Sequence, residues 1–262
     1  MDKVIVVKIG GATLGSHDTT IEDLVELQKQ GKSLVVVHGG GKLITDWLKK
    51  HGISSRFVQG ERVTDKATLE VVISVLAGLV NKEIVAAINS LGGRAVGLSG
   101  VDGAIIQGKV KNKELGYVGS VTKIDLTPLE ILLHSGYIPV VAPAALYLDK
   151  SDEKVRILNI NADIVAGEIA AAVGAESLIF LTDVAGVCDQ SGRLLPQLSP
   201  GEAEALIVSS VASGGMVPKI KACLIALSNT SAAHITDGRK PHALLREIEQ
   251  GGSGTTIQHL HA

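Results

Sequence analysis

Aromatic residues and excess positive charge are both scarce in this chain. Phe, Trp and Tyr together make up 2% of its 262 residues, and the formal net charge is −2 at pH 7. Proteins bind single-stranded nucleic acid by stacking bases on aromatic rings, and they bind duplexes by neutralising phosphates with Lys and Arg. Because the chain has little of either, we expect no nucleic-acid partner.

Cysteine is nearly absent, and histidine occurs without the spacing of a metal site. The two cysteines, Cys188 and Cys223, are expected to be buried apolar side chains without a disulfide. The eight histidines include no H-x-x-x-H or H-E-x-x-H pair. We therefore predict no metal site built from protein side chains.

The sequence also lacks a long apolar run and a leader segment. The hydrophobic fraction is 45%, but no stretch is expected to reach the roughly 18 apolar residues that span a bilayer, and Pro139 and Pro143 interrupt the longest run. The N-terminus enters a strand pattern at once, without a charged and apolar leader. We expect a soluble cytoplasmic protein that does not associate with membranes.

Strand and helix patterns alternate along the whole chain. The first strand pattern, at 4–9, is continuously apolar except for Lys8 and runs into Gly10 and Gly11, which is typical of a central parallel strand with both faces covered. Further strands are predicted at 33–38, 94–98, 137–142, 176–181, 232–236 and 254–257, and a hairpin at 104–110 and 117–126. Helices are predicted at 18–30, after 39–41, at 65–91 as one long helix, and at 127–135, 164–173, 200–208, 220–228 and 242–249. Gly174 marks the expected boundary between two lobes, 1–174 and 175–262.

Three glycines, Gly39 to Gly41, open the second helix. Glycines at a helix start present bare N–H groups, which suits binding of a phosphate. The stretch is not a Walker loop, because Val36 and Leu43 stand where a glycine and a hydroxyl belong. It is not a dinucleotide fingerprint either, because Ile44 replaces the third glycine.

Other polar residues are predicted at the same edge of the sheet. Asn159 and the pair Thr182–Asp183 follow strands, while Lys219 lies beside a glycine-rich helix start. Asn161 and Asp163 are also explained as an N-cap and a first-turn acid, a purely structural role. No serine, cysteine or histidine nucleophile is indicated. Glycine-lined anion sites with two lysines therefore favour phosphoryl transfer.

Six segments together resemble the amino acid kinase family, and within it the members that phosphorylate N-acetyl-L-glutamate. They are 7–11 (VKIGG), 38–41 (HGGG), 62–64 (RVT), 159–163 (NINAD), 182–187 (TDVAGV) and 214–219 (GGMVPK). The resemblance covers nearly the whole chain, in order. It implies a three-layer αβα sandwich around one mainly parallel sheet of about eight strands. The reaction implied is transfer of the γ-phosphoryl group of ATP, with Mg²⁺ held mainly by its phosphates, to the side-chain carboxylate of N-acetyl-L-glutamate in arginine biosynthesis.

The resemblance also implies a role for each matching residue. Lys8 and Lys219 would stabilise the transition state and Asp163 would orient them, while Arg62 and Asn159 would bind the substrate. The N-terminal lobe would hold the acyl-amino acid and the C-terminal lobe ATP. The remaining substrate residues implied are Gly40, Gly41 and Asn161, and the nucleotide residues are Gly10, Gly11, Thr182, Asp183, Val184, Ala185, Gly186, Val187, Val211, Ala212, Ser213, Gly215 and Met216.

Alternatives remain at this point. The substrate could be glutamate, aspartate or a carrier-bound aminoadipate, or the chain could be a nucleotide-binding regulator without activity. The broad apolar stripe of the long helix at 65–91 fits either a buried core helix or a two-fold interface. Because only Met1 and Asp2 precede Lys3 and the first strand pattern, an extra N-terminal helix, which the resemblance associates with arginine-inhibited relatives, is not expected. We expect a homodimer that arginine does not inhibit.

Overall fold

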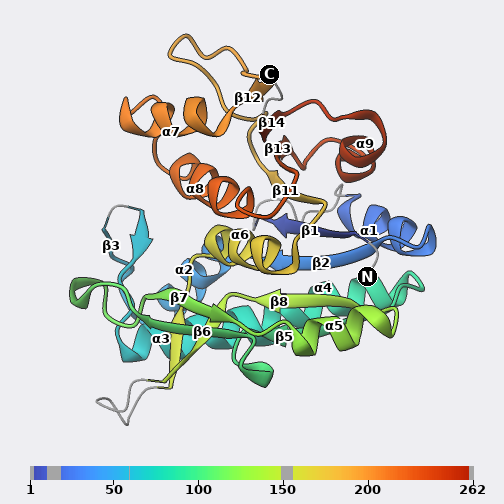
Figure 1. Cartoon of the computed structure of the whole chain (residues 1–262). Coiled ribbons are helices and arrows are strands. Elements are labelled where there is room, and N and C mark those ends of the chain that lie inside the picture. Colours follow the sequence, from blue (N-terminus) through green and yellow to red (C-terminus); the bar gives the residue numbers. More distant parts are fainter. Residues whose placement is uncertain (1–2, 11–18, 59, 149–155, 260–262) are drawn as a thin grey trace.

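One eight-stranded sheet organises the molecule (Figure 1). The computed structural model describes residues 3–10, 19–58, 60–148 and 156–259. Only the pair β13–β14 is antiparallel in this sheet, so the predicted mainly parallel sheet is confirmed. In spatial order its strands are β12 (Gln197–Leu198), β14 (Thr255–Gln258), β13 (Ala232–Asp237), β11 (Ser177–Thr182), β1 (Val4–Ile9), β2 (Ser33–His38), β8 (Ile138–Ala142) and β5 (Ala95–Ser99).

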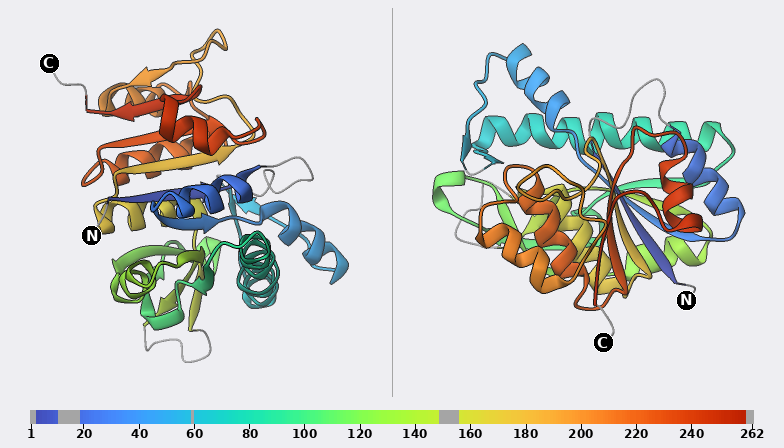
Figure 2. Two further views of the ribbon diagram at one scale, coloured as in Figure 1. Left: turned by 90° about the vertical axis from the view of Figure 1, so that its right-hand side faces the viewer. Right: turned by 90° about the horizontal axis from the view of Figure 1, so that it is seen from above.

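Helices cover both faces of the sheet and form two separate cores, as the αβα sandwich requires. One core packs under α5 (Thr127–His134), α6 (Ala162–Val173), α7 (Pro200–Val208) and α8 (Met216–Ala226). The other packs under α1 (Thr20–Lys29), α2 (Gly41–Lys50), α9 (Ala243–Gln250) and a long helix made of α3 (Lys66–Ile73), η1 (Ser74–Val80) and α4 (Asn81–Ser90). Figure 2 shows the long helix lying along one side of the molecule.

Alternation along β1 decides where its lysine points. Val4 and Val6 belong to the core beneath α6 and α8, whereas Ile5 and Val7 belong to the core beneath the long helix. Successive side chains of a strand point to opposite faces. Lys8 therefore points to the α6 side.

The same alternation on β2 sends its last side chain the other way. Val35 and Val37 lie in the core beneath α6, and Leu34 and Val36 in the core beneath the long helix. His38, two residues after Val36, therefore faces the long helix.

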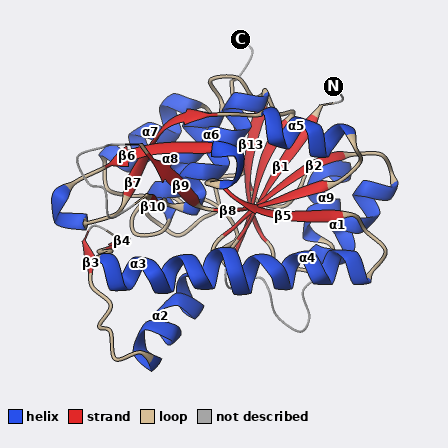
Figure 3. Ribbon diagram, turned by 90° about the horizontal axis from the view of Figure 1, so that it is seen from below, coloured by secondary structure: helices blue, strands red, loops and turns tan. Residues whose placement is uncertain are grey.

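The long helix is continuous, as predicted (Figure 3). Its middle, η1, is a π-helix. Asp65 caps its start by accepting the Thr68 backbone N–H at 2.8 Å. Four-residue steps overshoot an α-helical turn by about 40° each, so side chains at this spacing drift around the helix. The wider i→i+5 turn of η1 corrects the drift. The residues kept facing the sheet are Val72, Leu76, Val80, Ile84 and Ile88.

By length and composition, the long helix at Lys66–Ser90 could cross a membrane, so the expectation that no stretch qualifies was wrong. The mean hydropathy of its most apolar 18-residue window is 2.0, because aliphatic residues outnumber the few charged ones, Lys82 and Glu83 among them. The buried side chains of this helix face the sheet, and Asn81 is fully buried among them. In this fold one face of the helix packs on the sheet and the opposite face is exposed.

A second sheet carries four strands in the order β10 (Ile157–Asn159), β9 (Ala144–Tyr147), β6 (Ile106–Val110) and β7 (Gly119–Ile124). The predicted hairpin is β6–β7, and its joining segment includes the short 3₁₀ helix η3 (Lys113–Leu115). Another 3₁₀ turn, η2 (Asp102–Ala104), follows β5, and a small hairpin is formed by β3 (Phe57–Val58) and β4 (Glu61–Arg62). Ile106 of β6, Ala145 of β9 and Leu158 of β10 belong to the core that packs under α6, so this second sheet extends that core.

The burial of the cysteines differs in part from what the sequence suggested, and the structure adds a detail at the expected lobe boundary. Cys188 is exposed, so the expectation that both cysteines are buried was wrong; it lies in the segment after β11, whereas Cys223 is buried in α8. At the expected lobe boundary, Gly174 ends α6 in a left-handed conformation. β1 and β11 pair across that boundary, so both halves share one sheet.

Candidate active site

Two lysines from different elements converge on one buried carboxylate. Lys8 Nζ lies 2.7 Å from Asp163 Oδ1, and Lys219 Nζ lies 3.2 Å from Asp163 Oδ2. Lys8 is near the end of β1, Asp163 is in the first turn of α6, and Lys219 is in the first turn of α8. The structure thus brings together three residues that the sequence analysis singled out.

Electrostatics keep this carboxyl group ionised. Burial raises the pKa of Asp163, but the neighbouring charges of Lys8 and Lys219 outweigh it, so the pKa lies below its usual value. Two cations and one anion leave a net positive charge at this point. The site is therefore suited to attract an anionic ligand.

Local capping places Asp163 in the first turn of α6. Asn161 Oδ1 accepts the backbone N–H groups of Asp163 at 2.8 Å and Ile164 at 3.3 Å. An Asn side chain at this position satisfies N–H groups that the helix itself cannot pair. The structural role foreseen for Asn161 is therefore present, whatever it contributes to a ligand.

A glycine lets α6 and α8 approach closely enough for the ion pairs to form. A Cβ atom at Gly167 would lie 2.5 Å from the Ala222 carbonyl oxygen. Any larger residue would push the two helices apart. The distance between Asp163 and Lys219 thus depends on Gly167.

A cavity of about 210 Å³ lies next to the lysine pair. It is bounded by the turn after β2, by the end of β10 and by the start of α6, so the carboxyl ends of several strands meet there. Its lining residues include the predicted Lys8, Gly40, Gly41, Asn159, Asn161 and Asp163.

Arg62 lies beside the glycine turn but does not line this cavity. Its guanidinium donates to the Gly41 carbonyl at 3.1 Å and to the hydroxyls of Ser55 at 2.7 Å and Thr45 at 2.9 Å. It also lies over the Phe57 ring, 4.7 Å from the centroid. Burial lowers the pKa of Arg62. These hydrogen-bond partners are all neutral, so the positive charge is not neutralised by them.

Asn159 is linked by hydrogen bonds to Thr64, just after the β3–β4 hairpin that carries Arg62. Its side-chain amide donates to Thr64 Oγ1 at 3.2 Å, and the Thr64 hydroxyl donates to the Arg62 carbonyl at 2.8 Å. The Asn159 backbone N–H donates to the Tyr117 carbonyl at 2.9 Å. The two predicted substrate residues are therefore linked through one threonine.

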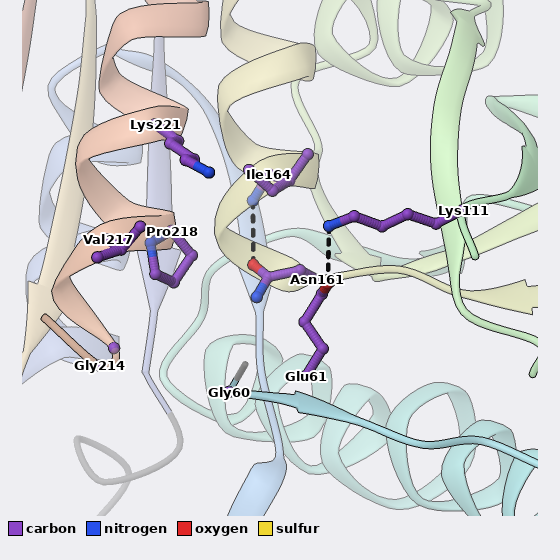
Figure 4. Close-up of a pocket in the computed structure, with 10 residues that line it drawn as sticks. Gly60, Glu61, Lys111, Asn161, Ile164, Gly214, Val217, Pro218 and Lys221 are labelled. Atoms are coloured by element: carbon purple, nitrogen blue, oxygen red, sulfur yellow. Dashed lines mark hydrogen bonds and ion pairs between the residues drawn. The ribbon is translucent and has the colours of Figure 1, made fainter. Parts of the chain in front are cut away.

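A larger cavity, of about 480 Å³, lies between the β3–β4 hairpin and the start of α8. Lys111 Nζ pairs with Glu61 Oε2 at 2.7 Å on one wall, and Pro218 and Lys221 form the other (Figure 4). The sequence analysis did not single out Glu61, Lys111 or Lys221 for this site. Glu61 and Lys111 belong to segments that meet only in the folded chain, so their spacing in sequence carried no signal.

The predicted nucleotide residues lie around the ends of β1 and β11. The Gly10 N–H donates to the Leu181 carbonyl at 3.1 Å, which puts Gly10 beside the end of β11. Gly11 lies outside the described residues. Val187 is buried and donates to Thr255 Oγ1 at 2.8 Å.

The other nucleotide residues fall into two groups. Thr182 is buried, and three exposed residues, Asp183, Val184 and Ala185, follow it before Gly186. Val211, Ala212 and Ser213 lie in the segment before α8, Gly215 lines the larger cavity, and Met216 begins α8. Neither of the two cavities described is lined by 182–187 or 211–213.

Comparison with known proteins gives consistent relatives. The model of the amino acid kinase family matches residues 3–237. An acetylglutamate kinase of Dehalococcoides mccartyi is 46% identical over 260 residues, covering 98% of this chain and 96% of that protein. An acetylglutamate kinase of Nostoc punctiforme is 48% identical over 265 residues, covering 97% and 87%. A crystal structure from Streptococcus mutans matches with a TM-score of 0.84 at 28% identity, covering 98% of this chain and 99% of that one.

Proposed function

The chain belongs to the amino acid kinase family, and we infer that it transfers the γ-phosphoryl group of ATP to the side-chain carboxylate of N-acetyl-L-glutamate, in arginine biosynthesis. The bond between the γ-phosphorus and the bridging oxygen breaks, a carboxylate oxygen bonds to that phosphorus, and ADP leaves. The product is N-acetyl-L-glutamyl 5-phosphate. The observation that carries the assignment is the pairing of Lys8 and Lys219 on Asp163, in a chain related over nearly its full length to acetylglutamate kinases.

The acceptor needs no general base. A carboxylate is already ionised at neutral pH, so the protein has only to align it and stabilise charge on the transferring oxygens. Lys8 faces the smaller cavity and would act from the acceptor side. Lys219, in the first turn of α8, would act from the donor side, and Asp163 would hold both ammonium groups in place.

The glycine turn would complete the acceptor side. Gly40 and Gly41 line the smaller cavity beside Lys8, where backbone N–H groups can approach phosphoryl and substrate oxygens closely. Asn159 lines the same cavity, and its amide would bind the acetamido group. Asn161 lines both cavities and would border the substrate.

Arg62 would bind the α-carboxylate of the substrate. Its present hydrogen-bond partners are two hydroxyls and a carbonyl, none of them charged. A guanidinium binds a carboxylate through two parallel hydrogen bonds, which are stronger than bonds to neutral groups. A short movement of the β3–β4 hairpin would bring Arg62 toward the cavity that it now adjoins.

ATP would be bound by the C-terminal half, 175–262, and the acyl-amino acid by the N-terminal half, 1–174. We place the nucleotide against Gly10, Gly11, Thr182 to Val187, Val211 to Ser213, Gly215 and Met216. Within the described residues no three His, Cys, Asp or Glu side chains gather as a metal site. Mg²⁺ would enter with ATP, held mainly by the phosphates, and would neutralise their charge.

The protein would act as a cytoplasmic homodimer. The long helix has an outward face with exposed Gly78, exposed Leu79 and half-buried Val85, and open space surrounds the position of a Cβ at Gly78. A helix that crosses its own copy at a small residue gives a self-complementary two-fold contact. Light scattering of the purified protein would measure the mass, and a monomer at micromolar concentration would contradict this part.

One assay tests the activity. ADP release would be coupled to a spectrophotometric reaction with N-acetyl-L-glutamate, glutamate, aspartate and carbamate in parallel. Hydroxylamine trapping would detect the acyl phosphate. We expect turnover and hydroxamate with N-acetyl-L-glutamate; activity with another acceptor only would overturn the assignment.

A further inference from the structure

His38 is completely buried at the end of β2, immediately before the glycine turn. Its Nδ1 atom lies 3.1 Å from the Gly39 carbonyl oxygen, and its Nε2 atom lies 3.2 Å from Nδ2 of Asn81. Asn81 is the first residue of α4, directly after the π-helical stretch of the long helix, and is also completely buried. One side chain thus joins the long helix to the turn that borders the smaller cavity.

The hydrogen bonds of Asn81 fix the tautomer of His38. The Asn81 amide nitrogen lies 2.9 Å from the Val140 carbonyl oxygen and 3.2 Å from the Leu98 carbonyl oxygen, so its NH₂ group must face them. Its oxygen accepts from Lys82 Nζ at 3.0 Å. The two NH₂ hydrogens are shared among those carbonyls and His38 Nε2, and an Nε2–H would point at this NH₂ group, so the tautomer that fits is the one whose Nδ1–H donates to the Gly39 carbonyl.

Burial keeps this imidazole neutral. It lowers the pKa of His38 to about 4; the hydrogen bond to the Gly39 carbonyl opposes this shift, and the charges of Lys8 on β1 and Lys82 on α4 add to it. Protonation would also set a donor against the Asn81 NH₂ group. His38 is therefore a fixed hydrogen-bonding unit and not an acid or base at neutral pH.

The residues around the His38–Asn81 contact are closely packed. A Cβ at Gly40 would lie 2.8 Å from Leu76 Cδ2, so the glycine turn lies directly on the π-helical stretch. A Cβ at Gly97, on β5, would overlap Asn81 Oδ1. The π-helical turn, Asn81 and the glycine turn therefore fit together as one block.

We propose that Asn81 and His38 are positioning residues through which the long helix fixes the Gly39–Gly41 turn in the geometry that phosphoryl transfer requires. Neither side chain touches the reacting atoms. Both act on the turn whose N–H groups and whose neighbour Lys8 contact the transferring group under the proposed function, on which this inference rests. A displacement of well under 1 Å in such a turn is enough to slow catalysis, because reaction demands close alignment.

The test breaks the link from both ends in the full-length protein. His38→Asn retains a donor near the Gly39 carbonyl but is too short to reach Asn81, and Asn81→Ala removes the far partner. We expect each to lower kcat with N-acetyl-L-glutamate and ATP by about tenfold or more, with KM for ATP changed by less than about threefold. The double variant should lose no more than the worse single variant, because one link is broken only once.

Ile88→Ala is the matched control, since Ile88 is fully buried on α4 but far along the helix from the turn. It should lower the melting temperature and leave kcat unchanged. If the two link variants also lose only stability, or if their kcat losses multiply in the double variant, the inference is overturned. A wild-type protein inactive with N-acetyl-L-glutamate would instead contradict the proposed function.

A measurement without substrate separates the two further. Nitrogen NMR of the wild-type imidazoles should show one histidine that stays neutral down to about pH 5 with its proton on Nδ1, and that signal should vanish in His38→Asn. Asn81→Ala should shift it or let it titrate at higher pH. A His38 signal that titrates near pH 6.5 in the wild type would refute the fixed link, whatever the activity of the protein.

Discussion

Lys8 and Asp163 form a buried ion pair, with Lys8 Nζ 2.7 Å from Asp163 Oδ1 and each side chain 8% exposed. The second oxygen of the same carboxylate receives Lys219. Because Asp163 neutralises only half of this paired charge, the lysines remain available to a phosphoryl group. The predictions that follow depend on that arrangement.

Removing either lysine should abolish most of the turnover. We expect Lys8→Ala and Lys219→Ala each to lower kcat by at least about 100-fold, since each removes a charge that stabilises the transition state. Steady-state ADP release is the measurement. Lys49→Ala, on an exposed position of α2, is the control and should be unaffected. Turnover near that of the wild type in either active-site variant would remove the mechanism.

Arg62→Ala should act on substrate binding. We expect KM for N-acetyl-L-glutamate to rise by about tenfold or more while KM for ATP stays nearly constant, because a grip on a carboxylate remote from the reaction gives uniform binding. Both constants are read from initial rates at varied concentrations. Arg94→Ala, which removes a guanidinium stacked on Tyr137, should change neither. Equal rises in both constants for Arg62→Ala would contradict its assignment.

Asp163→Asn should reduce stability in a pH-dependent way. The pKa of Asp163 in the folded protein lies below the ordinary value of 3.8, so its ionisation contributes stability above about pH 4 that is lost as the pH falls. At pH 7 the variant should lose about 3 kcal/mol or more, because the buried Lys8 and the partly buried Lys219 lose their charged partner. Thermal melts at pH 7 and pH 3 should show the difference shrinking at the lower pH. A difference independent of pH would show that the carboxylate charge is not what stabilises the fold.

The two cysteines should differ in reactivity. Cys188 is exposed, whereas Cys223 is buried and burial raises the pKa of its thiol. A thiol reagent should modify one cysteine per chain in the native protein and two after denaturation. Cys188→Ser should abolish the native reaction. Rapid modification of Cys223 in the folded protein would contradict its burial in α8.

Gly167→Ala should disturb the pairing of Asp163 with Lys219. The added methyl would meet the Ala222 backbone, so α6 and α8 must separate, at a cost of about 1–3 kcal/mol. Turnover should fall together with stability, because the two helices carry the paired charges. Gly201→Ala, where open space surrounds the added atom, is the matched control for both measurements. Unchanged turnover in Gly167→Ala would show that the pair tolerates helix movement.

Much of the fold was predictable because its signals are local. The apolar run at 4–9, the glycines at 39–41 and the cap at Asn161 each determine structure through near neighbours, and all three appear in the structure. The positions of Lys8 and Lys219 at a strand end and a helix start placed them near one edge of the sheet, whereas the pairing of both with Asp163 was expected only from the family resemblance. Elements with strong periodicity were therefore identified correctly.

What was missed depends on contacts between distant segments. The pairing of Lys111 with Glu61 joins the residue that follows β6 to β4, and no spacing in the sequence indicates it. The π-helical stretch does have a signal in the sequence: Val72, Leu76, Val80, Ile84 and Ile88 are four residues apart, a spacing that would drift around a regular α-helix. Cys188 was assigned to the core by residue type, although it follows a strand in an exposed segment.

Lys8 and His38 point to opposite faces of the sheet, so the function depends on the exact number of residues in β1 and β2. β1 and β2 are hydrogen-bonded in parallel register, with Lys8 opposite Val37 and Ile9 opposite His38. Inserting or deleting one residue within β1 would turn every later side chain of that strand to the other face, so the ammonium group would lie in the apolar core under the long helix. Loops between these elements can vary in length without this effect. A one-residue insertion or deletion within β1 or β2 should therefore abolish the activity, whereas one in a connecting loop should not.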